Sequence, residues 1–224
     1  MKVAFFGGSF DPPHSGHLAL ARLAIDRLQL DRLLVAPVGI QPLKQEFAPT
    51  AFRDRVAMAQ LAMADEPRVE VSLVDAPNAD GKPNYTIDTV RYLRAQLRRQ
   101  DRLFCLMGAD SFLTIGKWYQ ATELLMACDF IVGARPGFDL GRLAAALPET
   151  IAVAAEDSDV PGCLVLGMRN QTEKCSRLYL LPDLAKDVSA TELRRALQTG
   201  GETGEAVAPE VVGYIREYGL YRQI

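Results

Sequence analysis

The sequence predicts an α/β protein built on a doubly wound parallel sheet, with a Rossmann-like order of elements. Short apolar runs alternate along the chain with longer stretches of helical period. Several of these runs are almost continuously apolar, as strands that are covered on both faces should be. At about 150 residues per domain, the 224 residues correspond to a single domain, residues 1–224.

Each predicted element rests on its own apolar pattern. Six short runs are predicted to be strands: Val3–Phe6, Leu33–Ala36, Val69–Val74, Leu103–Met107, Phe130–Val132 and Leu178–Leu181. Three segments between them have the period of an amphipathic helix. Their evidence is one apolar face made of Leu18, Ala21, Ile25 and Leu28, the pattern of residues 51–64, and a stripe of Ile87, Val90, Leu93 and Leu97.

Two further regions complete the chain. Residues 139–177 are less regular and are predicted to be an insertion, with a possible helix over Gly141–Leu147 and a possible loop over Ala152–Asp159. Residues 189–224 are predicted to be a helical C-terminal part. Val212, Ile215 and Tyr218 have helical spacing there, and Gly219 follows them as an expected helix end.

The charge balance argues against a nucleic-acid-binding protein. Lys and Arg number 25 against 28 Asp and Glu, which leaves a net charge of −3 instead of a basic excess. The arginines at positions 91, 94, 98 and 99 are interpreted as a solvated helix face. A local basic pocket for one phosphorylated molecule remains compatible with this balance.

The location of the protein is predicted to be the cytoplasm. The four cysteines (Cys105, Cys128, Cys163 and Cys175) form no C-x-x-C pair and no zinc spacing with histidine, which fits a reducing compartment. The apolar start of the chain is interrupted by Gly7-Gly8, too early for a signal peptide. No stretch approaches the roughly 18 apolar residues that a membrane span requires.

Both histidines of the chain, His14 and His17, follow the first predicted strand. They belong to the run Gly7-Gly8-Ser9-Phe10-Asp11-Pro12-Pro13-His14-Ser15-Gly16-His17, at the turn into the first helix. Ligands of open α/β sheets bind at this edge, and a helix N-terminus attracts phosphate. The glycines admit a ligand close to the backbone, Ser9 adds a hydroxyl, and imidazoles can donate to phosphate oxygens or become cationic beside them. The turn therefore predicts phosphate chemistry.

Other interpretations of this turn are weaker. A single histidine near a helix start is usually structural, and Gly-Gly is usually only a turn. A metal site with Asp11 as third ligand is conceivable but poor, because no further Cys, Asp or Glu stands at ligand spacing. The chain also lacks the G-x-x-x-x-G-K-[ST] and G-x-G-x-x-G patterns, so neither a P-loop nor a dinucleotide fingerprint is present.

A second polar cluster, Val188-Ser189-Ala190-Thr191-Glu192-Leu193-Arg194, lies near the C-terminus. Ser189 and Glu192 fit a capping box at a helix start. A cap does not require Thr191 and Arg194, which add a hydroxyl and a bidentate cation to the same helix entrance. The cluster is therefore interpreted as a second anion-binding element.

Taken in order, these motifs resemble a known family. The first run is similar to the G-G-x-F-D-P-x-H-x-G-H signature of the nucleotidyltransferase superfamily, and the second to its I-S-x-T-x-x-R motif. Within that superfamily the chain most resembles the bacterial nicotinate-mononucleotide adenylyltransferases. The matching segments are Pro42-Leu43-Lys44, Asn84-Tyr85-Thr86-Ile87-Asp88-Thr89, Gly108-Ala109-Asp110, Trp118-Tyr119, Arg135-Pro136-Gly137 and the ending from Tyr214-Ile215 to Leu220-Tyr221. Ser9 stands in place of the usual Thr, and Leu43 in place of a common histidine.

The resemblance implies adenylyl transfer from ATP to nicotinate mononucleotide, which gives nicotinate adenine dinucleotide and pyrophosphate in NAD biosynthesis. It implies catalytic roles for His14, His17 and Arg194. The implied ATP-binding residues are Gly8, Ser9, Phe10, His14, His17, Gly108, Asp110, Ser189, Thr191 and Arg194. The implied mononucleotide-binding residues are Lys44, Thr86, Trp118, Tyr119 and Arg135, with Lys44 near the reacting phosphates. Mg²⁺ would be the cofactor, held mainly by phosphate oxygens and water.

Several of these residues have a structural alternative. Trp118 could be a core side chain instead of a platform for the pyridine ring. Thr86 could cap the helix that begins at Ile87, and Asp110 could cap a helix instead of binding ribose. Arg135 could flank the adenine or cap the sheet end.

Two rival functions also remain. The chain could be another enzyme of the superfamily, such as a pantetheine-phosphate adenylyltransferase or a cytidylyltransferase. It could instead be a nucleotide-sensing domain without catalysis. The sequence leaves open the oligomeric state and the preference for nicotinate over nicotinamide mononucleotide.

Overall fold

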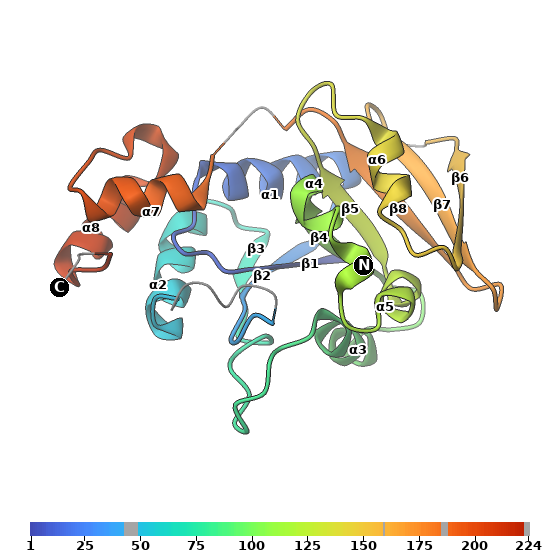
Figure 1. The fold of residues 1–224 in the computed structure, drawn as a ribbon, viewed down its shortest axis with the longest axis horizontal. Helices are drawn as coiled ribbons and strands as arrows, with labels where there is room; N and C mark the ends of the chain where they lie inside the picture. The colour runs from blue at the N-terminus through green and yellow to red at the C-terminus, as the bar shows by residue number, and fades with distance from the viewer. Residues whose placement is uncertain (43–48, 159, 185–187, 222–224) are drawn as a thin grey trace.

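The computed structural model describes residues 1–42, 49–158, 160–184 and 188–221. The described residues contain an eight-stranded sheet with the order β3-β2-β1-β4-β5-β8-β7-β6 (Figure 1). The strands are β1 (Lys2–Gly8), β2 (Arg32–Pro37), β3 (Val69–Val71), β4 (Arg102–Gly108), β5 (Asp129–Gly133), β6 (Ile151–Glu156), β7 (Leu164–Asn170) and β8 (Cys175–Leu181). All six predicted strands are present.

Helices and short 3₁₀ turns connect these strands. They are α1 (Ser15–Leu28), α2 (Phe52–Met63), α3 (Thr86–Gln96), α4 (Ala109–Phe112), η1 (Ile115–Lys117), α5 (Ala121–Ala127), α6 (Leu140–Ala145), α7 (Ala190–Gln198), η2 (Gly204–Ala206) and α8 (Pro209–Glu217). The three predicted amphipathic helices correspond to α1, α2 and α3. The helix considered over Gly141–Leu147 is present as α6, one residue earlier in the chain.

The core lies in two layers, one on each face of the sheet. In β1, Val3 and Phe5 contribute to the layer beneath α3 and α5, whereas Ala4 and Phe6 contribute to the layer beneath α1. Figure 1 shows α1 on one side of the sheet and α3 with α5 on the other. Burial on both faces explains why the central strands are almost continuously apolar.

The sheet is mixed, because its parallel part is extended by an antiparallel edge. β1, β2, β3, β4, β5 and β8 pair in parallel, whereas β7 runs antiparallel to both β8 and β6. The α/β class is confirmed. The loop predicted over Ala152–Asp159 is wrong for Ala152–Glu156, which lie in β6, and β7 was not predicted. The physical reason is that the apolar run of β6, residues 151–155, contains three alanines, which are depleted in strands, so the run did not distinguish a strand from a loop.

The C-terminal helices form a separate small core against α2. Met58 of α2, Leu193 of α7 and Val211 and Ile215 of α8 are buried together there. Gly219 ends α8 with a φ of 63°, and the N–H of Leu220 donates to the carbonyl of Ile215 at 3.0 Å, as in a Schellman motif. Figure 1 shows α7 and α8 beside α2 at one end of the molecule, opposite β6, β7 and α6. No helix in the described part of the chain combines the length and apolar character that crossing a membrane needs.

Candidate active site at the carboxyl edge of the sheet

The turn after β1 places its polar groups at the start of α1. Gly8 is the last residue of the strand, and His14 is the N-cap residue of the helix. Between them, Phe10 has a φ of 49°, which residues other than glycine seldom adopt. Its ring is buried, meets Phe6 edge-to-face with centroids 5.4 Å apart, and lies tilted against His17 with centroids 4.8 Å apart. This packing holds the turn in its unusual conformation.

The two imidazoles lie against each other. Their ring centroids are 3.7 Å apart, and His17 Nδ1 accepts a hydrogen bond from the backbone N–H of His14 at 3.2 Å. His14 Nδ1 is buried and has no hydrogen-bond partner among the described residues. Burial also lowers the pKa of His14 from 6.5 to about 4. His14 is therefore neutral near pH 7 in the empty site, with one ring nitrogen left for a ligand.

Asp11 ties this turn to three other parts of the chain. One carboxylate oxygen accepts a hydrogen bond from the hydroxyl of Tyr221 at 2.5 Å, and the other accepts from the backbone N–H of Thr50 at 3.0 Å. The main-chain oxygen of Asp11 accepts from Arg194 Nη1 at 2.8 Å. Asp11 is 5% exposed, so these donors stabilise a carboxylate that has little contact with water.

The second motif meets the first at Asp11. Ser189 is the N-cap residue of α7, and its hydroxyl accepts from the N–H of Glu192 at 3.4 Å. One turn later, Arg194 donates to the hydroxyl of Thr191 at 3.2 Å and to the Asp11 carbonyl. The structure thus brings together the polar ends of two motifs that the sequence places 183 residues apart.

Arg55 of α2 was not predicted to belong to the site, yet it joins the turn after β1 to both ends of the loop between β2 and α2. It is 2% exposed. Its guanidinium donates to the carbonyls of Ser9 (3.0 Å), Val38 (2.8 Å) and Gly39 (3.4 Å), and its Nε donates to that of Thr50 (2.9 Å). A sequence signal existed, because Arg55 falls three and four positions before the buried Met58 and Ala59 on the apolar face of α2.

Ser9 itself points its hydroxyl at a neighbouring loop. Ser9 Oγ donates to Gln41 Oε1 at 2.9 Å. Lys44, which the sequence places near the reacting phosphates, lies outside the described residues. The described part of the loop after β2 therefore reaches the phosphate-binding turn through Gln41.

Asn84 and Asp75 form a polar clamp that holds the loops after β2 and β3 together. The amide of Asn84 donates to the carbonyls of Asp75 and Ala76, and its oxygen accepts from the N–H of Ile40. Asp75 is 4% exposed and accepts from the Thr89 hydroxyl at 2.9 Å. Burial raises the pKa of the Asp75 carboxyl to about 6. A Cβ at Gly39 would lie 2.4 Å from the Pro77 nitrogen, so this clamp requires glycine.

Two of the segments predicted to bind the mononucleotide meet at a pair of tyrosines. The rings of Tyr85 and Tyr119 lie 4.4 Å apart, which brings the Tyr-Thr and Trp-Tyr segments together. Thr86 is the first residue of α3, and the N-cap is Tyr85, so the alternative role of Thr86 as the cap is wrong by one residue. Trp118 is partly buried against the core, and its Nε1 donates to the Thr114 hydroxyl at 3.0 Å. Trp118 therefore packs against the core while part of its side chain stays exposed.

The remaining predicted residues follow neighbouring parallel strands. Gly108 ends β4 and is the N-cap residue of α4, so Asp110 is exposed within that short helix and is not its cap. Arg135 is exposed after β5, in a turn in which Gly137 has a φ of 79° and the N–H of Phe138 donates to the Arg135 carbonyl at 3.1 Å. The roles of Gly108, Asp110 and Arg135 remain predictions.

The chemistry of the described donors suits an anion. Backbone N–H groups, hydroxyls, imidazoles and a guanidinium surround the turn, and the Asp11 carboxylate is already bonded to protein donors. Among the residues that the structure describes, no group of three or more His, Cys, Asp or Glu could hold a metal ion.

The sequence family follows from comparison with known proteins. The pattern that defines the cytidylyltransferase-like family matches residues 5–196. The chain belongs to this family. Within it, the chain is 36% identical over 222 residues to a protein of Solibacter usitatus, covering 99% of this chain and 100% of that protein. A protein of Gloeobacter violaceus is also 36% identical, with 98% and 96% covered. Both are named "Probable nicotinate-nucleotide adenylyltransferase", so the family resemblance seen in the motifs is confirmed.

Solved structures of the family share the fold. The nicotinic acid mononucleotide adenylyltransferase of Plasmodium falciparum superposes with a TM-score of 0.68 in its complex with APC and 0.70 in its complex with NaAD. The two comparisons cover 98% of this chain and 96% and 97% of the other, at 16% and 17% identity. At this identity the likeness shows the nucleotidyltransferase fold alone.

Proposed function

We propose that this chain transfers the adenylyl group of ATP to nicotinate mononucleotide. The products are nicotinate adenine dinucleotide and pyrophosphate. The observation that carries the proposal is the meeting of the His14–His17 turn with Arg194 at Asp11, in a family whose full-length relatives bear the name of this activity. The Plasmodium structures with APC and NaAD add support for an adenine nucleotide and the dinucleotide product as ligands.

The chemistry needs no general base. An oxygen of the mononucleotide 5′-phosphate attacks the α-phosphorus of ATP, and the bond from that phosphorus to the bridging α,β-oxygen breaks. The electron pair of the broken bond leaves with pyrophosphate. Because the nucleophile is already an anion, the rate depends on alignment of the two phosphates and on stabilisation of the charge that develops on the leaving group.

The phosphate-binding residues divide this work. His14 and His17 donate to the ATP phosphates, and the buried, unpartnered Nδ1 of His14 supports a ligand-facing role for that ring. Arg194, Ser189 and Thr191 hold the β- and γ-phosphates, while Gly8, Ser9 and Phe10 shape the turn beside them. The position of the Arg194 guanidinium is fixed by its hydrogen bonds to the Asp11 carbonyl and the Thr191 hydroxyl. Lys44 acts near the reacting phosphates.

Mg²⁺ is the proposed cofactor and is carried by the triphosphate. The anion-binding donors described above fit a metal that is held by phosphate oxygens, because they leave the protein with few cation ligands to offer. When bound, Mg²⁺ neutralises charge on the phosphates. The protein residues orient the phosphates to which it is bound.

The acceptor is held by the aromatic side of the site. Trp118 stacks on the pyridine ring, and backbone N–H groups near Thr86 and Tyr119 receive the nicotinate carboxylate. The contact between Tyr85 and Tyr119 supports this pairing, because it brings the two segments that carry these groups together. Gly108 and Asp110 contact the nucleotide sugar, and Arg135 flanks the bound nucleotides. We place the reaction in the cytoplasm, with small-molecule substrates and no nucleic acid or membrane partner.

The deciding experiment measures pyrophosphate release from ATP and Mg²⁺ with different acceptors. Nicotinate mononucleotide, nicotinamide mononucleotide and phosphopantetheine are compared under the same conditions. The proposal expects the highest kcat/KM with nicotinate mononucleotide. Fast release with phosphopantetheine alone would assign the chain to a different enzyme of the superfamily. ATP binding without release for any acceptor would make it a nucleotide sensor.

A further inference from the structure

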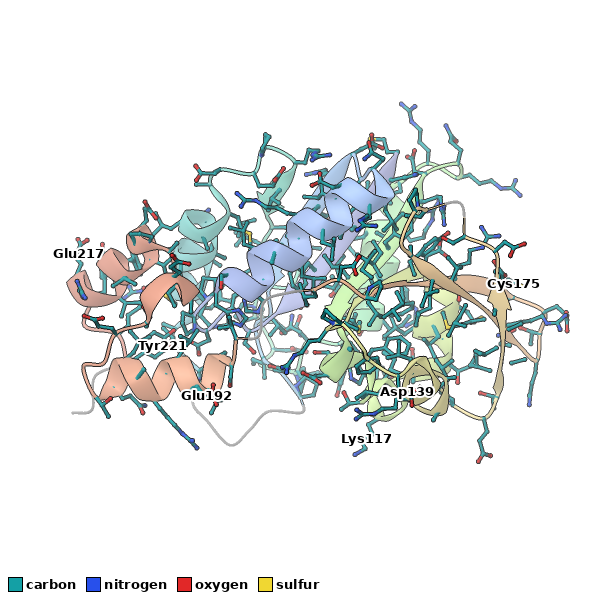
Figure 2. The ribbon with its side chains drawn as sticks, turned by 90° about the horizontal axis from the view of Figure 1, so that it is seen from above. Lys117, Asp139, Cys175, Glu192, Glu217 and Tyr221 are labelled. Atoms are coloured by element: carbon teal, nitrogen blue, oxygen red, sulfur yellow. The ribbon has the colours of Figure 1, made fainter. Side chains whose placement is uncertain are left out.

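The C-terminal segment supplies one hydroxyl to the phosphate-binding turn. Tyr221 lies four residues after the end of α8, and its hydroxyl donates to Asp11 Oδ1 at 2.5 Å. Figure 2 shows Tyr221 at the same end of the molecule as Glu192 of α7. The contact joins residues 210 positions apart in the chain. It therefore connects the last described residue of the protein to the turn that carries the histidines.

The surroundings of Tyr221 fix this hydroxyl in place. Its ring packs against the small core that contains Met58 and Ile215. Its φ is 65°, a conformation that costs a bulky residue about 1 kcal/mol or more and persists only when the surroundings enforce it. Burial and the charge of Asp11 raise the pKa of the Tyr221 hydroxyl well above its ordinary value, so the group stays a donor at all physiological pH values.

Asp11 connects Tyr221 to both the histidine turn and Arg194. Its backbone precedes His14 by three residues, and its carbonyl accepts from Arg194 at 2.8 Å. Movement of Asp11 therefore shifts the histidine turn and the anchor of Arg194 together. Thr50, the second donor to the carboxylate, belongs to the loop that Arg55 also holds.

We propose that Tyr221 is a positioning residue for adenylyl transfer: by holding Asp11, its hydroxyl keeps the histidine turn and Arg194 aligned on one triphosphate. The inference rests on the proposed function for the identity of the reaction. Tyr221 does not touch the substrate, and it acts through Asp11. It extends the site to Tyr221, beyond the histidine turn and the segment that carries Arg194.

The same segment supplies a matched control. Tyr214 of α8 donates its hydroxyl to Asp54 of α2 at 2.9 Å, so it also joins the C-terminal helices to the rest of the protein. Asp54 lies on α2, where its carboxylate also pairs with Arg53 at 3.5 Å. Tyr214→Phe and Tyr221→Phe each remove one hydroxyl from a tyrosine–aspartate hydrogen bond. Only the second change alters a bond to the turn.

The experiment compares both variants with the unsubstituted full chain in steady-state kinetics, ATP titration without acceptor, and thermal unfolding. We expect Tyr221→Phe to lower kcat by about tenfold or more, because small misalignments of reacting groups are costly. The KM for nicotinate mononucleotide should stay within about twofold, since the acceptor residues lie on other loops. Tyr214→Phe should lower the unfolding temperature comparably and leave kcat within about twofold.

A second pair of variants tests the route through Asp11. Asp11→Ala should lower kcat in the same direction, and the double variant Asp11→Ala with Tyr221→Phe should lose no more than the larger single loss, because each change removes the Tyr221–Asp11 hydrogen bond. Multiplying losses would overturn the proposal. So would equal kcat values for Tyr221→Phe and Tyr214→Phe, whether both are unchanged or both are reduced.

The ATP titration separates this inference from the proposed function. If the unsubstituted chain releases no pyrophosphate with nicotinate mononucleotide, the proposed function fails. The dissociation constant for ATP then decides the role of Tyr221. A weakening of about threefold or more in Tyr221→Phe but not in Tyr214→Phe supports it, whereas equal affinities, or no ATP binding by the unsubstituted chain, overturn it.

Discussion

The two imidazoles of the site have different surroundings. His17 Nδ1 accepts a hydrogen bond from the backbone N–H of His14, which fixes the orientation of the His17 ring. His14 is half-buried, its pKa is lowered to about 4, and its Nδ1 has no hydrogen-bond partner among the described residues. Under the proposed function, the His17 ring is therefore oriented before ATP binds, and a ligand supplies the missing partner of His14.

The clearest test at this scale is His17→Ala. Loss of a preorganised donor to the ATP phosphates should lower kcat by about 10²-fold or more. The fold should persist, since His17 lies on the first turn of α1. Pyrophosphate release measures the first effect and circular dichroism the second. Normal turnover in a folded variant would remove His17 from the mechanism.

A second residue-scale prediction concerns Trp118. Trp118→Leu keeps an apolar side chain against the core but removes the flat ring. If the ring binds the pyridine, the KM for nicotinate mononucleotide should rise about tenfold, as loss of a stacking contact of 1–1.5 kcal/mol would produce. The KM for ATP should stay constant. A variant with lower thermal stability and unchanged KM values would show that Trp118 is only a packing residue.

Among elements, α2 has a larger part in the site than its sequence suggested. Arg55 reaches from this helix to the carbonyls of Ser9, Val38 and Thr50, so one side chain sets the spacing between the turn after β1 and the two ends of the β2–α2 loop. The guanidinium supplies hydrogen-bond donors to backbone carbonyls of these loops, in place of backbone N–H groups. Burial lowers the pKa of Arg55, while the charge of Asp11 opposes that effect.

Arg55→Met should therefore destabilise the protein by about 3 kcal/mol, because it leaves buried carbonyl groups without donors. It should also lower activity more than stability alone explains, since the turn that carries Ser9 loses its support. Arg53→Met is the control: Arg53 lies on the same helix, and its side chain is 86% exposed. Urea unfolding of both variants, at equal protein concentration, measures the difference. Equal unfolding midpoints would contradict the prediction.

The elements that the sequence could predict are those with a complete local pattern. Apolar runs predict the central strands, and helical spacing predicts α1, α2 and α3. Ser189 and Gly219 mark the start of α7 and the end of α8 by their capping chemistry. β6 and β7 do have apolar runs, but three of the five residues in the run of β6 are alanine and Gly167 interrupts the run of β7, so neither run was distinctive of a strand.

Site residues follow the same division. His14, His17 and Arg194 belong to compact motifs and could be found from sequence. Arg55 and Tyr221 contact residues that are distant in the chain, so the local spacing of residues could not identify their partners. Asp75 was missed for the same reason, since its burial is created by Thr89 and Asn84.

Across the whole molecule, the pH dependence of stability contains two opposing contributions. The carboxyl of Asp75 has a pKa of about 6 when folded and 3.8 when unfolded. The folded state therefore binds this proton more tightly, and stability is lost as the pH rises from about 4 through 6. His14 acts in the opposite sense: its pKa is about 4 when folded and 6.5 when unfolded, so stability is lost as the pH falls through that range.

Asp75→Asn separates the two contributions. The amide keeps an acceptor for Thr89 and does not ionise. The variant should be more stable than the unsubstituted chain above pH 6, by up to about 3 kcal/mol from a shift of 3.8 to about 6. The gain should vanish near pH 4, where the native carboxyl is protonated. Urea unfolding at pH 4, 5, 6 and 7.5 tests this, and a gain that does not depend on pH would contradict it.

The bond between Asp11 and Tyr221 has a consequence for biosynthesis. Arg194 and Tyr221 follow Asp11 by 183 and 210 positions, so they leave the ribosome after the turn with the histidines. Contacts of such sequence separation form late, since the intervening chain must be ordered before they close. Under the proposed function, a nascent chain therefore holds no complete triphosphate site until Tyr221 has been made, and nucleotide stabilises the protein only after that point.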